Sequence, residues 1–342
     1  MVTQPAGRRA GSAPTLETVA HRAGVSRATV SRVVNGDDRV AEHLRAAVER
    51  AVGELGFVPN RAARALAGRT PDSVALIMRE PAAFGAVDPY LSSMVVGLSN
   101  ALVGPGLQFV VMMAPKDRDD AAVASYARAH VDAVLLISVH DDDALPGVLA
   151  AAGLPVVTGG RLRVPVVGVS SVDVDNVGGA RLATEHLISR GRTRIGCIAG
   201  ALDARSGSDR KAGFLLAMQA AGLSDSLVVE GDWTAQSGQA AAAQLLRSAP
   251  DLDGIVAGSD VMAMGALHAI RAAGRRVPED VAVVGFDDID LASHTSPPLT
   301  TVRQPAAHQA QRMIDVLLAR LDGGVEDTEI ELPVELVIRE SS

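Results

Sequence analysis

From residue 73 onward, short apolar runs alternate with longer amphipathic stretches, and this alternation limits the fold more than any other feature. Buried strands are predicted at VALIM (74–78), FVVMM (109–113), AVLLIS (133–138), PVVTG (155–159), IGCIAG (195–200), LVVEG (227–231), GIVAGS (254–259) and VAVVGF (281–286). Helices are predicted between them at about 90–103, 119–130, 176–190, 209–221, 236–248 and 260–273. This order favours parallel sheets of the doubly wound α/β type. So many strands exceed one sheet of usual size, so we expect two lobes.

Charge is distributed unevenly along the chain. The 342 residues carry a net charge of −8. Residues 1–69 nevertheless hold eleven arginines against six Asp or Glu, which leaves that segment at +5 and the rest at −13. A basic segment ahead of an acidic body predicts that only one end of the protein binds a polyanion.

Several classes of protein and site are disfavoured by the sequence. No signal-peptide or membrane-spanning run is present, so we expect a cytoplasmic protein without membrane association. The single cysteine, Cys197, lies in an apolar run and is expected in the core. The histidines form no His-x-x-x-His pair, and no strand leads into a phosphate-binding glycine loop. The acidic runs at 172–176 and 141–143 lack calcium-loop spacing and are expected to serve as a helix cap and a solvated loop. We therefore expect no metal, no cofactor and no enzymatic activity.

The first sixty residues predict a small helical unit. Residues 1–13 are expected to form a disordered tail, and residues 14–58 three helices. Thr15 can cap the first helix, Gly24 ends it, and Ser26 can cap the second only two residues later. Two short helices joined by a tight glycine-containing turn and braced by a third are typical of a helix-turn-helix unit.

The second helix lies within the stretch SRATVSRVVNG (26–36), which is apolar on one side and basic on the other. In a helix-turn-helix unit this helix enters the DNA major groove. Arg27 and Arg32 can then bind guanine, and Ala28 can contact a thymine methyl group. The hydroxyl groups that suit phosphate oxygens are those of Ser26, Thr29 and Ser31. The alternative is a three-helix bundle with a solvated arginine face.

Residues 59–72 predict a hinge helix that is too short to stand alone. Asn60 can cap a helix that runs to about Ala67. Eight residues fall below the roughly 12–15 that an isolated helix needs in water, so we expect this helix to form only when something supports it. The alternative places Leu66 against the body as an ordinary linker anchor.

Residues 15–68 resemble the headpiece of the LacI/GalR family of bacterial repressors, through the motifs VAHRAGVS, TVSRVVN and PNRAARALA. The resemblance covers the whole chain. It implies a homodimer that binds a near-palindromic DNA operator. Because the sequence ends at VIRESS without a leucine heptad, we expect none of the coiled-coil tetramerisation of some relatives. The resemblance also implies further DNA contacts from Thr15, Asn35, Asn60, Arg61, Arg64, Leu66 and Ala67, with Leu66 as an apolar wedge in the minor groove.

The same resemblance implies that residues 73–342 form a two-lobed effector and dimerisation domain similar to periplasmic binding proteins. Lobe 1 is expected at about 73–172 and 303–320, and lobe 2 at about 173–302 and 328–340. The chain would cross between them near Val172, near Val302 and near Ala319–Glu331. A sugar or oligosaccharide effector would bind in the cleft between the lobes and set the affinity for DNA.

Candidate effector residues follow from where the strands end. Ligands of parallel sheets bind outside the carboxyl ends of the strands. The candidates are Asp88, Tyr90, Arg161, Ser206, Arg210, Trp233, Ser259, Asp260, Asp287 and Gln304. Carboxylates and arginines can pair with sugar hydroxyls, and the indole of Trp233 offers a flat face to a pyranose ring. Arg210 and Asp287 match effector contacts of the family that the chain resembles.

Alternatives stay open at several of these positions. Asp260 can instead cap the following helix, and Arg161 can lie on the surface of a lobe. For the whole protein, the alternatives are a regulator with a non-sugar or co-repressing ligand, a solute-binding protein, and a sugar-processing enzyme.

Overall fold

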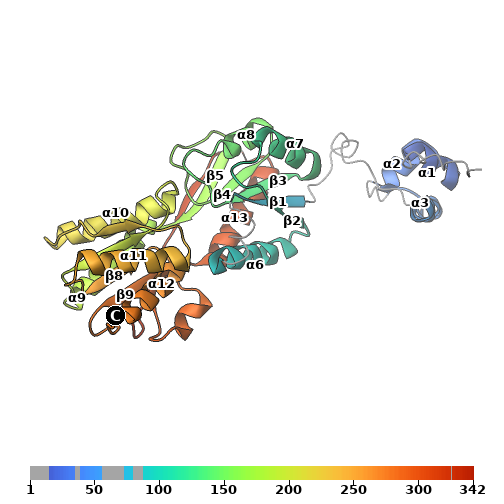
Figure 1. The fold of residues 1–342 in the computed structure, drawn as a ribbon. Helices are drawn as coiled ribbons and strands as arrows, with labels where there is room; N and C mark the ends of the chain where they lie inside the picture. The colour runs from blue at the N-terminus through green and yellow to red at the C-terminus, as the bar shows by residue number, and fades with distance from the viewer. Residues whose placement is uncertain (1–14, 35–38, 56–72, 80–87, 325) are drawn as a thin grey trace, which may run out of the picture. The chain divides into compact units, whose positions relative to one another are not determined.

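The computed structural model describes residues 15–34, 39–55, 73–79, 88–324 and 326–342, and its contacts divide the chain into two compact units, Met1–Pro71 and Asp72–Ser342 (Figure 1). The predicted tail and the predicted hinge helix both lie outside the described residues.

The first unit has one small core shared by three helices. These are α1 (Leu16–Ala23), α2 (Arg27–Val34) and α3 (Glu42–Leu55). Each helix contributes one fully buried valine, namely Val19, Val30 and Val48. Because α1 and α2 are joined by a short turn and both pack on α3, the predicted helix-turn-helix arrangement is confirmed.

Polar side chains fix the ends of α1 and the start of α2. The hydroxyl of Thr15 accepts from the N–H of Thr18, and the Thr18 hydroxyl accepts in return from the N–H of Thr15. Gly24 ends α1 with a φ of 67°, a left-handed conformation that glycine adopts without strain. The N–H of Thr29 donates to the hydroxyl of Ser26, so Ser26 satisfies the first turn of α2 as predicted.

The first lobe of the second unit is a parallel sheet between two layers of helices. Its strand order is β11-β5-β4-β3-β1-β2. The strands are β1 (Ser73–Met78), β2 (Gln108–Met113), β3 (Ala133–Ile137), β4 (Val156–Gly159), β5 (Val169–Val174) and β11 (Glu329–Leu332). The helices are α6 (Pro89–Val103), α7 (Asp120–His130), α8 (Leu145–Ala151) and α13 (Ala306–Leu321). Successive residues of β1 serve opposite faces: Leu76 packs with α6 and α13, and Ile77 with α7 and α8.

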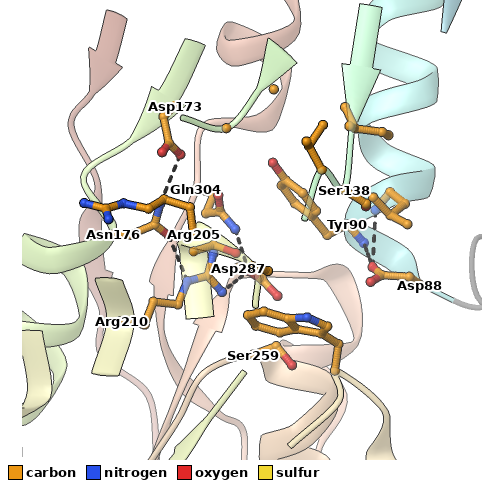
Figure 2. Close-up of a pocket in the computed structure, with 18 of the residues that line it drawn as sticks. Asp88, Tyr90, Ser138, Asp173, Asn176, Arg205, Arg210, Ser259, Asp287 and Gln304 are labelled. Atoms are coloured by element: carbon orange, nitrogen blue, oxygen red, sulfur yellow. Dashed lines mark hydrogen bonds and ion pairs between the residues drawn. The ribbon is translucent and has the colours of Figure 1, made fainter. Parts of the chain in front are cut away.

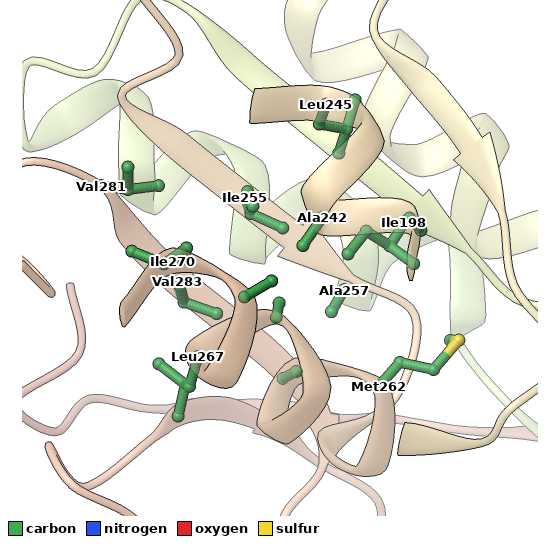
Figure 3. Close-up of a cluster of buried hydrophobic side chains, with 14 of the residues drawn as sticks. Ile198, Ala242, Leu245, Ile255, Ala257, Met262, Leu267, Ile270, Val281 and Val283 are labelled. Atoms are coloured by element: carbon green, nitrogen blue, oxygen red, sulfur yellow. The ribbon is translucent and has the colours of Figure 1, made fainter. Parts of the chain in front are cut away.

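The second lobe repeats this plan. Its strand order is β12-β10-β9-β8-β6-β7, parallel except for the pairing of β12 with β10. The strands are β6 (Ile195–Ala199), β7 (Val228–Glu230), β8 (Gly254–Ala257), β9 (Ala282–Asp287), β10 (Thr300–Arg303) and β12 (Glu335–Val337). The helices are α9 (Asn176–Ser189), α10 (Arg205–Ala220), α11 (Ala235–Ser248), α12 (Asp260–Ala272) and the 3-10 helix η1 (Asp290–His294). Helices α11 and α12 cover the face that carries Ile255 and Val283 (Figure 3).

Cys197 lies in the core on the opposite face of this sheet, among residues of α9 and α10. Burial raises the pKa of its thiol to about 12. The predicted structural role of this cysteine is therefore confirmed.

The structure contains elements that the apolar pattern did not predict. Strands β5, β10, β11 and β12 and helices α8 and α13 were missing from the prediction. In β5 the apolar run is interrupted by Ser170, Ser171 and Asp173, yet all six residues of the strand are buried. A buried strand that carries polar side chains has no hydrophobic signature of its own.

Two predicted boundaries need correction. Residues 328–340 were assigned to lobe 2, but β11 pairs with β5 in the first sheet, and only β12 joins the second. The chain therefore crosses back between residues 332 and 335. The first crossing follows Val174, because β5 continues in the first sheet to that residue.

One acidic run is also more structured than predicted. Asp143 is not part of a solvated loop, because its side chain is fully buried and accepts from Nε of Arg79 at 2.6 Å. In the run 172–176, Asp175 does cap α9, and its carboxylate accepts from the N–H of Gly178.

Candidate functional site

Helix α2 exposes the side chains that the sequence predicts at base edges. Arg27, Ala28 and Arg32 are exposed, whereas Val30 and Val33 on the other side of the helix are buried. The helix is thus held by its valines and presents its arginines outward. That arrangement suits a recognition helix.

The hydroxyl groups of this unit already take part in local hydrogen bonds. Those of Ser26 and Thr29 lie 2.9 Å apart, Thr15 caps α1, and Ser31 is half-buried. A hydroxyl group both donates and accepts, so one that accepts a hydrogen bond in a helix cap can still donate to a phosphate oxygen. The remaining predicted DNA contacts lie outside the described residues: Asn35, Asn60, Arg61, Arg64, Leu66 and Ala67.

A cavity of about 120 Å³ lies between the two lobes (Figure 2). One water needs only about 10–15 Å³, so the space accommodates a ligand with several polar groups. Its lining includes the predicted residues Asp88, Tyr90, Arg161, Ser206, Arg210, Trp233, Ser259, Asp287 and Gln304. Polar residues that sequence reasoning missed also line it: Ser138, His140, Asp173, Asn176, Arg205 and Gln309.

Arg210 on α10 is fixed at several points inside this cavity. Its Nη1 lies 3.3 Å from Oδ1 of Asp287, and both side chains are less than one-tenth exposed. Its Nε donates to Oδ1 of Asn176 at 2.9 Å, and its Nη1 donates to the carbonyl of Gly258. The guanidinium also lies 3.7 Å from the centre of the Phe286 ring. These contacts hold its plane in one orientation, so little rotamer freedom remains to be lost when a ligand binds.

Asp287, at the end of β9, combines burial with several polar partners. Burial raises the pKa of its carboxyl to about 7, and nearby Asp88 adds to this while Arg210 opposes it. The amide of Gln304 donates to the same oxygen that faces Arg210. A carboxylate placed in this way can change its charge near neutral pH.

Backbone strain concentrates at this cavity. Among the described residues other than glycine, positive φ occurs at Ser138 (57°), Trp233 (69°), Asp287 (116°) and Asp288 (56°). Three of these four line the cavity, and Asp288 follows the third. Such conformations are unfavourable for L residues and persist where the surroundings enforce them, which is a feature of binding sites.

Trp233 packs its indole against the backbone at the end of β6. A Cβ atom added to Gly200 would lie 1.9 Å from the ring, so no other residue fits there without moving the indole. The guanidinium carbon of Arg210 lies 5.5 Å from the ring centre. The indole is therefore a fixed apolar wall beside the charged pair.

Several lining residues also hold the ends of helices. Asp88 caps α6 by accepting from the N–H groups of Tyr90 and Leu91. The Tyr90 hydroxyl donates to Oε1 of Gln309 at 3.0 Å, and burial raises the pKa of Tyr90, so it remains a neutral donor. Ser259 caps α12. These residues can contact a ligand while they anchor the helices that carry the site.

Asp260 does not line the cavity, so its predicted place among the effector residues is wrong. It does not cap α12 either, because Ser259 does. Its carboxyl is fully buried in lobe 2, where it accepts hydrogen bonds from the N–H of Ile289 and from the hydroxyl of Thr301. Burial and the neighbouring Asp287 raise its pKa well above the ordinary value. It ties α12 to the segments on either side of η1.

Arg161, which follows β4, is a bridge between lobes and not a lobe-surface residue. Its Nη2 lies 3.1 Å from Asp209 on α10 of the second lobe. The same group lies 3.3 Å from Glu331 on β11, and its Nε lies 3.4 Å from Asp173 on β5, both in the first lobe. Its side chain is 28% exposed, so these ion pairs are partly shielded from water.

A second contact joins the lobes at the cavity wall. Nδ1 of His140 lies 3.0 Å from Oδ2 of Asp203, and the N–H of Asp141 donates to the carbonyl of Asp203 at 2.7 Å. His140 also forms an isolated antiparallel bridge with Ala204. The loop after β3 and the loop after β6 are thus hydrogen-bonded to each other across the cleft.

Within the described residues, no group of His, Cys, Asp and Glu is arranged to hold a metal ion. The same residues include no helix with the length and apolarity needed to span a bilayer.

Two family profiles match the chain in the places that the fold suggests. Residues 15–60 match bacterial regulatory proteins of the lacI family, and residues 184–342 match a periplasmic binding protein-like domain. The chain is 47% identical over 333 residues to the HTH-type transcriptional regulator CelR of Thermobifida fusca. This alignment covers 96% of this chain and 98% of the relative.

Solved structures give the same result. A complex of the transcriptional regulator CelR with cellobiose superimposes with a TM-score of 0.77 at 46% identity, covering 96% of this chain and 100% of the other. The lac repressor dimer bound to operator and the anti-inducer ONPF gives a TM-score of 0.79 at 31% identity, with 96% and 99% covered. The chain therefore belongs to the lacI family of bacterial regulatory proteins, as the resemblance of its sequence predicted.

Proposed function

We propose that the protein is a transcriptional repressor that binds operator DNA through α2 and responds to a β-linked glucose disaccharide, of which cellobiose is the type. The observation that carries this proposal is the cleft, where a fixed indole adjoins the Arg210–Asp287 pair between two lobes. An aromatic face and paired charged groups together suit a sugar. The relative solved with cellobiose supports the choice of sugar.

The operator-binding form is proposed to be a homodimer, because one headpiece contacts only half of a near-palindromic site. Exposed valines lie on one edge of the first lobe: Val96 and Val103 on α6, and Val110 and Val111 on β2. An edge strand with exposed apolar side chains needs a cover. The lac repressor neighbour is a dimer, which favours a second copy of this chain as that cover.

The cleft is proposed to bind its sugar without converting it. The protein is also proposed to be cytoplasmic, because it would bind operator DNA. Two relatives of this chain, CelR and the repressor PurR, are transcriptional regulators. Incubation of the purified protein with cellobiose should leave the disaccharide intact by chromatography. Release of glucose would instead favour a sugar-processing enzyme.

The sole tryptophan, Trp233, allows effector binding to be measured directly. We expect cellobiose to change the fluorescence of Trp233 and to change the affinity for operator DNA over the same concentration range. Maltose, the α-linked isomer, serves as the matched ligand and is expected to do neither. Trp233→Ala should weaken cellobiose binding about tenfold by isothermal titration calorimetry, since stacking and burial of the ring are lost. Equal effects of both sugars would contradict the proposed linkage, and no effect of either would contradict the proposed effector.

Effector affinity is expected to depend on pH through Asp287. Its raised pKa of about 7 means that the carboxylate is ionised above pH 7 and becomes protonated below it. Sugar hydroxyls donate best to the ionised form. The dissociation constant should therefore rise about tenfold between pH 8 and pH 6.

Isothermal titration calorimetry at several pH values measures this dependence. His140 also lines the cavity, so His140→Asn is the control. The pH dependence should survive that substitution. Its disappearance would contradict the role of Asp287 in this dependence.

A further inference from the structure

An ion pair joins the first two helices of the DNA-binding unit. Glu17, in the first turn of α1, has Oε1 3.1 Å from Nη1 of Arg27, the first residue of α2. The two side chains are 63% and 68% exposed. A pair this exposed adds little to stability, so stability does not account for it.

The position of Glu17 is unfavourable for DNA binding in general. In a helix-turn-helix unit the first helix crosses the sugar-phosphate backbone while the second lies in the groove. A carboxylate beside phosphates is repelled by them and weakens sequence-independent affinity. An acidic residue there adds nothing to the general attraction for DNA, and its partner on α2 is Arg27.

The Glu17–Arg27 ion pair suits a guanine–cytosine base pair. In the major groove guanine presents two acceptors, N7 and O6, and its partner cytosine presents a donor, N4. When a carboxylate oxygen pairs with Nη1, the guanidinium still has enough free N–H donors to bind both acceptors of guanine.

We infer that Glu17 is a positioning residue that makes Arg27 selective for a guanine in each half of the operator. This inference rests on the proposed function, because it requires sequence-specific DNA binding. Glu17 lowers total affinity for DNA and raises discrimination between bases. It does so by limiting the rotamers that Arg27 samples, so that the guanidinium is held for the two acceptors of guanine.

The same unit contains a matched control. Arg22 on α1 pairs with Glu54 on α3, and these side chains are 58% and 52% exposed. This pair has the same charges and similar exposure but does not involve α2. Glu54→Gln therefore removes the same charge as Glu17→Gln without changing the surroundings of Arg27.

The test selects binding sites from duplexes that carry an inverted repeat with randomised half-sites, with the full chain as wild type, Glu17→Gln, Glu54→Gln and Arg27→Ala. Wild type should select a guanine that Arg27→Ala no longer selects. Glu17→Gln should reduce that preference about five- to tenfold and should bind unselected DNA more tightly. Glu54→Gln should keep the wild-type preference. Circular dichroism of each variant checks that the helices remain folded.

A double substitution separates positioning from net charge. Adding Glu17→Gln to Arg27→Ala should leave base preference unchanged, because the residue that Glu17 positions is gone. A wild-type preference in Glu17→Gln, or an equal loss in Glu54→Gln, would overturn the inference while leaving the proposed function intact. A wild-type protein that selects no sequence would overturn the proposed function, and this inference with it.

Discussion

Replacement of Arg210 with alanine is expected to abolish the response of operator binding to cellobiose and to lower the free energy of unfolding by about 3–5 kcal/mol. The first effect follows from the loss of a fixed guanidinium in the cavity wall. The second follows because Asp287 and the carbonyl of Gly258 would lose a partner in a buried setting. Urea unfolding measures the stability, and fluorescence anisotropy of labelled operator measures the response.

A second substitution distinguishes the two effects. Adding Asp287→Asn to Arg210→Ala removes the buried carboxyl that lost its partner, and asparagine tolerates the positive φ of this position better than most residues. Much of the lost stability should return, whereas the response to cellobiose should not. A double variant that responds at wild-type cellobiose concentrations would show that neither side chain contacts the effector.

Arg32→Ala is expected to weaken operator binding by about 1–3 kcal/mol, which is roughly 5- to 150-fold, and to relax the preference at one base pair of each half-site. Arg32 is exposed in the last turn of α2, on the side away from the buried valines. Thr29→Ala should weaken binding more evenly across sequences, because a hydroxyl on phosphate carries no base information.

Arg50→Ala is the matched control for this loss of charge. Arg50 is exposed on α3, and its Nε donates to the carbonyl of Ala46 within the same helix. Gel-shift titrations with the selected operator and with single-base variants compare the two substitutions. Equal effects of Arg32→Ala and Arg50→Ala would mean that Arg32 acts only through its charge, and that another face of α2 meets the bases.

Much of the cleft was predictable from sequence because one rule locates it. Side chains at the carboxyl ends of parallel strands gather at one edge, so residues far apart in the chain, such as Arg161, Trp233 and Asp287, were expected together and do line one cavity. The rule requires only that the strands be recognised, and their apolar runs were clear.

The remaining lining residues were missed for identifiable reasons. Asp173 lies inside β5, whose polar residues concealed the strand, and Gln309 lies on α13, a helix that the pattern did not predict. Asp260 was misplaced by a single position: Ser259 faces the cavity and caps the helix, while the next side chain turns into the interior. Sequence places a residue at the end of a strand, but it does not say which way the side chain turns.

The contacts between the loops after β3 and β6, together with the Arg161–Asp209 pair, have a consequence for the speed of the response. They join the lobes beside the cavity, so we expect a sugar to enter or leave the cleft only when they separate. The rate at which the sugar associates is then limited by this opening step and stays below the diffusion limit. The same step precedes departure, so a bound sugar remains for longer than its affinity alone implies. We therefore expect the regulator to stay in its sugar-bound state for some time after free sugar has been exhausted.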